Sequence, residues 1–169
     1  EQKIHDHATM VPHYAHFNAI GQESELKNSN DCICGGKYCA PDPDDNRDNT
    51  GADVLQEDLR QRCVYKLYNQ QTWWKYVTHY DDFCLTGGRM QSCSENILTS
   101  MKISIDAVNK CVQDSFDTRD IKTCRSNRLL DEEEKAMDKD GVFLFPSVII
   151  NGFAYRVNES FYYSPLTPS

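Results

Sequence analysis

The chain has 169 residues, a length that favours one main domain. Hydrophobic residues make up 39% and charged residues 26% of the sequence, which is typical of globular proteins and not of disordered ones. A net charge of −8 without a basic cluster would repel phosphate backbones, so nucleic acid is not an expected partner. No apolar run reaches the roughly 18 residues that span a bilayer. We therefore expect membrane attachment only through segments that are not in this chain.

Eight cysteines indicate the compartment. An even number of cysteines in an acidic globular chain is expected where disulfides persist, in the secretory-pathway lumen or at the extracellular surface of the cell. Asn158-Glu159-Ser160 is an N-glycosylation acceptor pattern and agrees with that compartment. The sequence predicts disulfides that involve Cys32, Cys34, Cys39, Cys63, Cys84, Cys93, Cys111 and Cys124.

A zinc site is the competing interpretation of the first three cysteines. Cys32, Cys34 and Cys39 resemble half of a zinc knuckle, but a structural zinc site needs a second close pair of Cys or His ligands. The other cysteines lie singly along the chain, and most histidines gather near the N-terminus. Structural disulfides are therefore favoured over a metal.

The first expected elements are an edge strand and a long loop. Residues 9–17 mix β-branched and aromatic residues over the length of a strand, which Pro12 limits to a sheet edge or a strand start. Residues 18–52 are rich in Gly, Asn, Asp, Ser and Pro and contain three cysteines. This composition predicts an ordered loop that disulfides staple in place.

A helical block is predicted over residues 53–113. Leu55, Leu59, Cys63 and Leu67 recur at a spacing of four, which places them on one helix face behind Asp53 as the candidate N-cap. Three more helices follow from apolar and aromatic residues at helical spacings. They are expected over residues 73–83, ended before Gly87-Gly88, over residues 92–101, and over residues 105–111 after a Ser104 cap.

The last third combines a charged segment with a hairpin. Residues 114–141 are strongly charged, and the run 131–140 is compatible with a helix but is expected to be a solvated face. Residues 142–150 are apolar and predict a buried strand pair split at Pro146. Asn151-Gly152 is a two-residue turn signal, so residues 153–157 are expected to form the return strand, followed by an extended tail.

This order of elements is similar to that of a thioredoxin-like fold with inserted helices. In that fold the proline follows a cis peptide bond, which makes Pro146 a cis-proline candidate. The expected fold class is α/β (α+β), as a degenerate, disulfide-rich thioredoxin-like fold. One module is expected over residues 1–169, with the stapled loop at 18–52 and the helical insertion at 53–113.

Several short motifs resemble the central luminal region of the vacuolar sorting receptor family, which lies between a protease-associated domain and EGF-like repeats. The resemblance covers residues 9–157, and its specificity comes from the order and spacing of the motifs together. The motifs are Val11-Pro12-His13-Tyr14, Cys32 seven residues before Cys39 in Gly36-Lys37-Tyr38-Cys39-Ala40-Pro41-Asp42-Pro43, Gly51-Ala52-Asp53-Val54, Asp58-Leu59-Arg60-Gln61-Arg62-Cys63, Trp73-Trp74 before Tyr76-Val77-Thr78, and Pro146-Ser147-Val148-Ile149-Ile150-Asn151.

The resemblance implies a type I membrane receptor, or a relative of one, whose luminal side binds sorting signals on soluble cargo proteins. In that family the protease-associated domain carries most of the signal-binding surface, so the resemblance assigns no cargo-binding residue here. Cys34 and Cys124 are additional to the family's cysteine framework and can pair with each other. These departures leave open a secreted or surface-assembly relative that uses the same module.

A thioredoxin-type enzyme needs Cys-x-x-Cys at the end of its first strand, where a helix N-terminus lowers the pKa of the attacking thiol. Here Asn18-Ala19-Ile20-Gly21 follows Phe17, and no cysteine occurs before Cys32. Cys32-Ile33-Cys34 is the one close pair, and it keeps a thiol-disulfide oxidoreductase or isomerase open as the alternative function. The sequence has no nucleophile elbow of the kind that would indicate a hydrolase. We therefore predict no enzymatic activity.

An acidic stretch follows the ligand offsets of a calcium loop without its defining residues. Arg47 stands where the sharp turn needs glycine, and Asp53 stands where the bidentate glutamate belongs. A simple acidic turn is therefore favoured over calcium, and no other cofactor is expected. The calcium candidates are Asp42, Asp44, Asn46, Asp48 and Asp53.

Two further groups have weaker functional interpretations. Histidines near the N-terminus could bind a metal or sense pH; they are His5, His7, His13 and His16. Trp73 and Trp74 point about 100° apart on a helix, so one is expected in the core and the other partly exposed. The sequence as a whole predicts a non-catalytic binding or structural module with protein ligands or neighbouring subunits as partners. An architectural role in an extracellular assembly is a further alternative.

Overall fold

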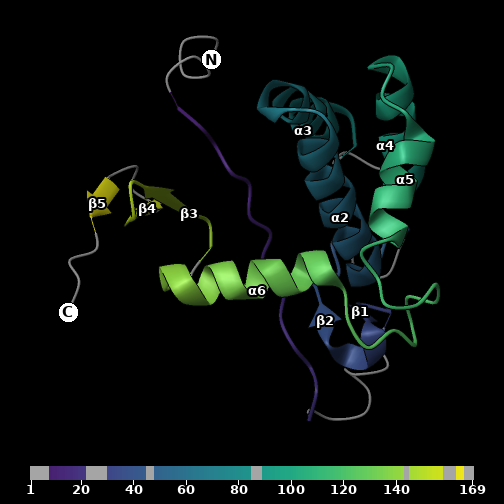
Figure 1. The fold of residues 1–169 in the computed structure, drawn as a ribbon, viewed down its shortest axis with the longest axis horizontal. Helices are drawn as coiled ribbons and strands as arrows, with labels where there is room; N and C mark the ends of the chain where they lie inside the picture. The colour runs from purple at the N-terminus through teal and green to yellow at the C-terminus, as the bar shows by residue number, and fades with distance from the viewer. Residues whose placement is uncertain are drawn as a thin grey trace.

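The computed structural model describes residues 8–21, 30–44, 48–84, 89–142, 145–157 and 163–165. Helices α2 to α5 form one block, with α6 across its lower side and a small sheet beside α6 (Figure 1). The elements in chain order are β1 (Cys32–Ile33), the 3-10 turn η1 (Cys34–Gly36), β2 (Tyr38–Cys39), α2 (Gly51–Leu67), α3 (Gln70–Cys84), α4 (Met90–Ser100), α5 (Ile105–Gln113), α6 (Arg128–Asp140), β3 (Ser147–Ile150), β4 (Phe153–Val157) and β5 (Tyr163–Pro165).

Helices α2 to α5 occupy residues 51–113, where the sequence predicted a helical block over 53–113. Helix α2 is its centre and contacts α3, α4 and α5. Leu55, Leu59 and Cys63 are buried as their spacing predicts, whereas Leu67 at the end of α2 is exposed. Ser104 caps α5 as expected, because its side chain accepts a hydrogen bond from the backbone N–H of Ala107.

The N-cap of α2 is Thr50, so the assignment to Asp53 was wrong. The Thr50 side chain accepts from the Asp53 N–H, and the Asp53 carboxylate accepts from the Thr50 N–H at 2.9 Å, which forms a capping box. Both residue types are good caps, and the acidic member of the box was mistaken for the cap itself. Gly51 follows because the chain is crowded there: a Cβ at this position would lie 2.0 Å from the Ala40 carbonyl oxygen.

One hydrophobic core joins the helical block to α6 and to the first cysteines. Its largest fully buried apolar and aromatic side chains come from β1, β2 and each of the helices α2 to α6. They are Ile33, Tyr38, Leu55, Leu59, Val64, Tyr76, Leu98, Val108, Leu129 and Leu130. A core that draws on both the cysteine-rich part and the helices indicates that these parts fold as one unit.

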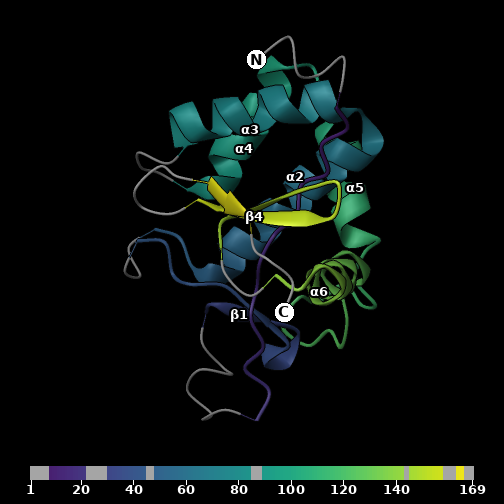
Figure 2. The same ribbon diagram turned by 90° about the vertical axis from the view of Figure 1, so that its left-hand side faces the viewer.

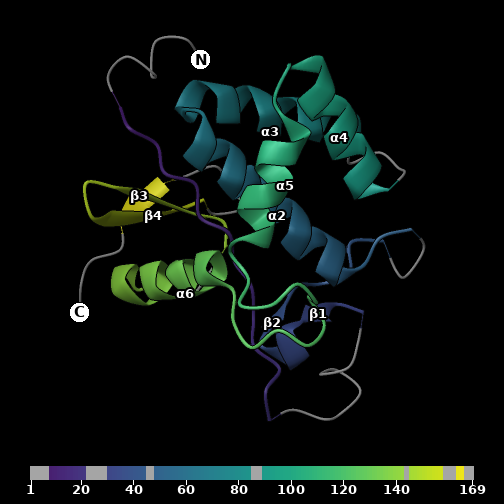
Figure 3. The same ribbon diagram turned by 45° about the vertical axis from the view of Figure 1, so that its right-hand side comes forward.

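The strand predicted over residues 9–17 is wrong. The chain there forms a single bridge, between Phe17 and Cys39, and residues 8–19 otherwise run as an extended strap across α6 and α2 (Figure 3). Helix side chains, rather than a neighbouring strand, lie beside the strap and satisfy its backbone groups. An extended sequence pattern cannot distinguish these two environments.

The loop predicted over residues 18–52 contains a compact cysteine hairpin, residues 32–39. Its two short strands β1 and β2 pair antiparallel, with Cys32 opposite Cys39. The turn between them uses left-handed backbone at Cys34, Gly35 and Gly36. The described part of this loop is therefore ordered and stapled, as its composition predicts.

The acidic run 131–140 is helical and belongs to α6, and it is largely solvated as predicted except at Glu133, which is buried. Asn127 is the N-cap and accepts from the backbone N–H groups of Leu129 and Leu130. Gly141 ends the helix in the left-handed conformation. Leu129, Leu130 and Glu133 share the inward face and are almost fully buried.

The C-terminal sheet has the order β3-β4-β5 and is antiparallel. Asn151 and Gly152 form the predicted turn with φ of 52° and 82°, and the Phe145–Pro146 peptide bond is cis. The expectation of a buried strand was wrong for the described residues, because Val148 and Ile150 are 44% and 54% exposed. The sheet lies beside the C-terminal end of α6, on the side away from α4 and α5 (Figure 1), and it faces the viewer in Figure 2.

The expected fold class, a disulfide-rich α+β chain, is confirmed. Among the described residues, no helix is long and apolar enough to cross a membrane. Residues 143–144, Gly87-Gly88 and the end of the tail lie outside the described part of the chain, and the predictions made for them remain predictions.

Candidate functional site

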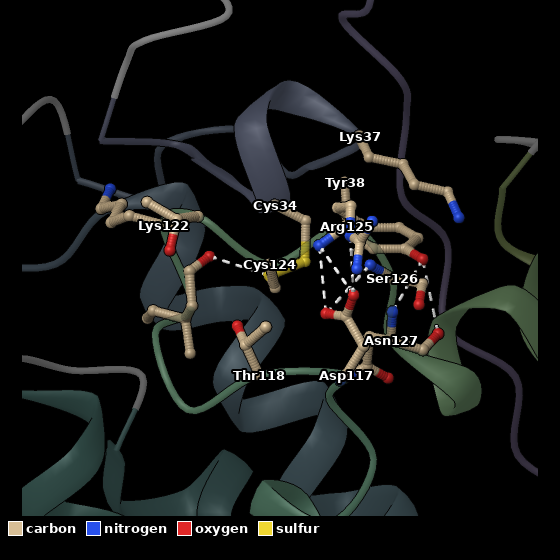
Figure 4. Close-up of a disulfide and its surroundings, with 12 residues drawn as sticks. Cys34, Lys37, Tyr38, Asp117, Thr118, Lys122, Cys124, Arg125, Ser126 and Asn127 are labelled. Carbon is tan, nitrogen blue, oxygen red and sulfur yellow. Dashed lines mark hydrogen bonds and ion pairs between the residues drawn. A yellow bond between two sulfur atoms is a disulfide. The ribbon is translucent and has the colours of Figure 1, made fainter.

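Disulfides fix the cysteine hairpin to the loop between α5 and α6. Cys32 pairs with Cys39 within the hairpin, and Cys34 pairs with Cys124 across 90 residues of sequence. Figure 4 shows the second bond between the hairpin and the loop that leads to α6. Cys34 and Cys124, which the sequence indicated as a candidate pair, thus bond to each other.

Hydrogen bonds around this disulfide add to the same contact. The Cys34 N–H donates to the Ile121 carbonyl at 2.8 Å, and the Asn127 N–H donates to the Tyr38 hydroxyl at 3.0 Å. Tyr38 in turn donates to Asp131 of α6 at 2.7 Å. The hairpin is therefore bound at its turn and at its second strand, and the surroundings of the disulfide are structural (Figure 4).

The remaining cysteines staple the helical block. Cys63–Cys111 joins α2 to α5, and Cys84–Cys93 joins α3 to α4. All eight cysteines lie in the described residues, and none is free. This confirms the expectation that the cysteines form disulfides.

A redox dithiol is missing at both places where the sequence could hold one. The strap carries no cysteine, and the close pair Cys32 and Cys34 is divided between two different disulfides. Cys32 and Cys34 are also buried, at 3% and 5% exposure. A thiolate that attacks other proteins must be accessible, so this geometry does not favour exchange chemistry.

The calcium candidates take part in local loop and cap contacts. Asp44 accepts from the Asn49 side chain at 2.9 Å and from its backbone N–H at 3.1 Å, while Asp53 completes the α2 capping box. Asp42 accepts from the Asp44 N–H at 2.9 Å, and Asn46 lies outside the described residues. Within the described ranges, no group of three or more His, Cys, Asp or Glu side chains is placed to hold a metal. The preference for a simple acidic turn over a calcium site therefore stays a prediction.

The strap and α2 supply ionic partners for Glu133, an inward-facing carboxylate on α6. His13 Nδ1 lies 2.7 Å from Glu133 Oε2, and Arg62 Nε of α2 lies 2.8 Å from the other carboxylate oxygen. The Glu133 side chain is 2% exposed. A carboxylate this deeply buried needs partners of opposite charge, and the strap and α2 provide them.

His16 forms the second ionic contact between the strap and α6. Its Nε2 lies 3.3 Å from Glu134 Oε1, and its side chain is only 1% exposed. Burial lowers the pKa of His16 below its ordinary value, although the Glu134 and Glu133 carboxylates act in the opposite direction. Of the four N-terminal histidines, the structure thus places His13 and His16 on acidic partners. His5 and His7 lie outside the described residues.

Two further carboxylates of α2 lie close to this cluster. Glu57 is buried, accepts from Tyr76 at 2.8 Å and from Ser94, and pairs with Arg60 at 3.1 Å. Burial raises its pKa. Asp58 is half-buried, and burial together with the negative charges of Glu57 and Glu133 raises its pKa to about 8.

Trp73 and Trp74 differ in burial, as expected of adjacent residues on a helix. Trp73 is buried and its Nε1–H donates to the Tyr14 hydroxyl at 3.0 Å, whereas Trp74 is only half-buried. Trp73 is therefore part of the contact with the strap. The glycosylation candidate Asn158 lies outside the described residues and remains a prediction.

Sequence reasoning missed Glu133 and Arg62 as members of one site. A signal for Glu133 was present, because it follows Leu129 and Leu130 by four and three residues and so shares their helix face. Arg62 gave no comparable signal, since it lies one residue before the buried Cys63, on a different side of α2. Its role depends on where the strap runs.

Three curated relatives resemble the chain over most of its length. The matches are Vacuolar-sorting receptor 7 of Arabidopsis thaliana, 33% identical over 138 residues, Vacuolar-sorting receptor 4 of the same plant, 33% over 160, and Vacuolar-sorting receptor 1 of Pisum sativum, 31% over 162. They cover 74%, 86% and 86% of this chain. The chain spans only 21%, 24% and 25% of their lengths.

No solved structure matches the chain significantly. The family model of the vacuolar sorting receptor thioredoxin-like domain matches residues 2–160. This match confirms both the resemblance seen in the sequence motifs and the thioredoxin-like assignment of the fold. The chain belongs to the vacuolar sorting receptor thioredoxin-like domain family.

Proposed function

We propose that the chain is a non-catalytic, protein-binding module of a cargo-sorting receptor or of a close relative. The relatives are named as vacuolar-sorting receptors, and the family model covers nearly all of the chain. Sorting requires recognition of other proteins, which makes protein ligands the expected partners. The disulfide framework supports a location in the secretory-pathway lumen or outside the cell, because such bonds rarely persist in the cytosol.

The observation that carries the non-catalytic part of the proposal is the closure of all eight cysteines into four disulfides. A thioredoxin-like enzyme works through a paired dithiol and an accessible attacking thiolate. The closest cysteines, Cys32 and Cys34, each have another partner and are buried. The cysteines thus stabilise the module rather than react.

An enzyme assay tests this part directly. The oxidised chain is incubated with insulin and reduced glutathione, and insulin reduction is followed by turbidity against thioredoxin as a positive control. We expect no turnover above the uncatalysed rate. Turnover that Cys34→Ser abolishes and Cys84→Ser preserves would overturn the proposal in favour of an oxidoreductase.

Binding is tested with proteins that carry vacuolar sorting signals. Purified precursors and their mature forms without the signal are passed over the immobilised chain, in oxidised form and after reduction and alkylation. We expect saturable binding of precursors by the oxidised chain alone. Equal binding of precursor and mature forms, or none, would contradict a cargo-recognition role, and self-association into large particles would favour the architectural alternative.

A further inference from the structure

The strap is bound through its backbone at every second residue. Gln70 of α3 accepts from the Met10 N–H at 2.8 Å and donates to the Ala8 carbonyl at 3.3 Å. The Tyr65 hydroxyl of α2 donates to the Met10 carbonyl at 2.8 Å. One amide side chain and one hydroxyl therefore hold three backbone groups of an extended segment.

The same pattern continues along the strap. Arg62 of α2 donates to the Pro12 carbonyl at 3.3 Å, and Glu133 of α6 lies 3.4 Å from the Tyr14 N–H. In the described residues, pairing with another backbone begins only at Phe17, which exchanges both hydrogen bonds with Cys39. Residues 8–14 are thus recognised by side chains of three helices, in a manner that does not depend on the strap's own side chains.

Two strap side chains add specificity. Pro12 is buried, and Tyr14 forms one wall of a small cavity between α2 and α6, whose other walls include Leu59, Leu129 and Leu130. The Tyr14 hydroxyl donates to Gln61 at 3.0 Å and accepts from Trp73 Nε1 at 3.0 Å. Backbone contacts that hold an extended chain, with pockets for alternate side chains, are the usual means by which proteins recognise extended peptides.

The remaining strap side chains make weaker contacts. Met10 and Val11 are 37% and 50% exposed, and the His13 side chain is 40% exposed. Because only Pro12 and Tyr14 hold the segment through side-chain burial and no disulfide ties it down, it opens locally at a lower cost in free energy than the disulfide-bonded body. The strap can therefore leave its site while the disulfide-bonded body stays folded.

We infer that this site, the strap seat, is a peptide-binding site that residues 8–14 occupy in cis and that an extended segment of a partner protein occupies after displacing them. The strap seat comprises Gln61, Arg62, Tyr65, Gln70, Trp73 and Glu133. The inference rests on the proposed protein-binding function and names its ligand class. That ligand is an extended segment with proline followed two residues later by tyrosine.

Charge restricts the ligand further. The seat and its edge carry the carboxylates of Glu133 and Glu134 against the single guanidinium of Arg62. In cis, His13 and His16 lie on these two carboxylates. A partner segment with a basic or imidazole side chain between its proline and tyrosine fits the seat, and an acidic one does not.

A labelled peptide with the sequence of residues 8–17 tests the inference on the full, oxidised chain. Tyr14→Phe weakens only the cis occupant, since it removes two hydrogen bonds from the strap and leaves the seat intact. Peptide binding competes with the strap, so a larger open fraction lowers the apparent Kd in proportion. With a net contribution near 1 kcal/mol for each of the two hydrogen bonds, we expect Tyr14→Phe to bind the peptide about thirtyfold more tightly than the unaltered chain, by fluorescence anisotropy.

Matched variants separate the seat from general effects. Tyr68→Phe alters an exposed tyrosine whose hydroxyl contacts the Ser104 N–H, and it should bind the peptide as the unaltered chain does. A peptide with its own tyrosine changed to phenylalanine should bind Tyr14→Phe without this gain of about thirtyfold. If Tyr14→Phe proves unfolded by circular dichroism, His13→Gln serves as the second strap variant, with a gain in the same direction.

Equal affinity of Tyr14→Phe and the unaltered chain for the peptide would overturn the inference, as would equal affinity of the two peptides for Tyr14→Phe. Those results together with retained precursor binding would refute the strap seat and leave the proposed function standing. Dimerisation of the strap variants in sedimentation experiments would instead assign the seat to the strap of a second copy, and would also overturn the inference.

Discussion

His13 and Glu133 lie 120 residues apart in sequence and 2.7 Å apart in space, between Nδ1 and Oε2. The carboxylate is almost fully buried, and its other oxygen pairs with Arg62. One side chain of α6 is thus the common anchor of the strap and of α2. Variants of the residues that pair with Glu133 can test how much this contact contributes to stability.

Arg62→Ala should destabilise the chain strongly. It leaves the buried Glu133 carboxylate with the half-exposed His13 as its remaining ionic partner and also removes the donor to Pro12. Removal of one partner of a buried ion pair costs about 3 kcal/mol or more. Urea unfolding of the oxidised protein, followed by circular dichroism, measures the loss.

The control is Arg128→Ala, an arginine of α6 in an exposed pair with Glu132 at 2.9 Å. Pairs of this kind contribute below about 1 kcal/mol. Similar losses for the two variants would mean that Glu133 is solvated and does not depend on Arg62.

Stability should also fall in mildly acidic solution because of His16. Its pKa is lowered in the folded chain by burial, so the unfolded chain takes up the proton first as the pH falls below about 6.5. The free energy of unfolding therefore decreases as the pH falls. We expect the advantage of the unaltered chain over His16→Gln to shrink between about pH 7.5 and about pH 5.5, as measured by urea unfolding.

The comparison with His16→Gln is needed because Asp58 changes the pH dependence of stability in the opposite direction to His16. Its pKa is raised to about 8, so its contribution to stability is lost as the pH rises from about 4 towards 8. That contribution is common to both proteins and cancels in the difference. His79→Gln, at an exposed position of α3, should leave the pH dependence unchanged, and a flat difference for His16→Gln would contradict burial of the His16 ring.

The sequence was a good guide wherever the signal was local. Leu55, Leu59 and Cys63 at a spacing of four predicted the buried face of α2, and Asn151-Gly152 predicted the tight hairpin turn. Both signals act within a few residues, because helix periodicity and turn backbone depend on near neighbours alone.

The sequence was a poor guide wherever the outcome depends on distant partners. The pattern of residues 9–17 predicted extended backbone correctly but not the helix side chains that lie beside it. Val148 and Ile150 predicted a strand correctly but not its exposure, because an apolar run does not specify what covers it. The strap seat was missed for the same reason, since Arg62, Gln70 and Glu133 meet only through the tertiary fold.

Loss of the Cys34–Cys124 disulfide should destabilise the chain more than loss of Cys84–Cys93. The first bond closes 90 residues of sequence and the second closes 9. The Cys63–Cys111 bond shortens the larger loop to roughly 40 residues, for which the loop-entropy relation gives about 4 kcal/mol, against about 2.5 kcal/mol for the smaller loop. Cys34→Ala with Cys124→Ala, and Cys84→Ala with Cys93→Ala, are compared by urea unfolding. The opposite order would show that the cysteine hairpin stays docked without its covalent link.

The exposed side chains of β3 predict that Ile150 contributes little to stability. Ile150 of β3 is 54% exposed, whereas Ile33 of β1 is 0% exposed, and both lie in short strands. Threonine keeps the β-branched shape, so Ile150→Thr should change the free energy of unfolding by about 0.5 kcal/mol or less. Ile33→Thr buries a hydroxyl in the core and should cost about 2 kcal/mol or more. The same denaturation measurement on both variants decides the matter, because a large loss at Ile150 would place β3 inside the core.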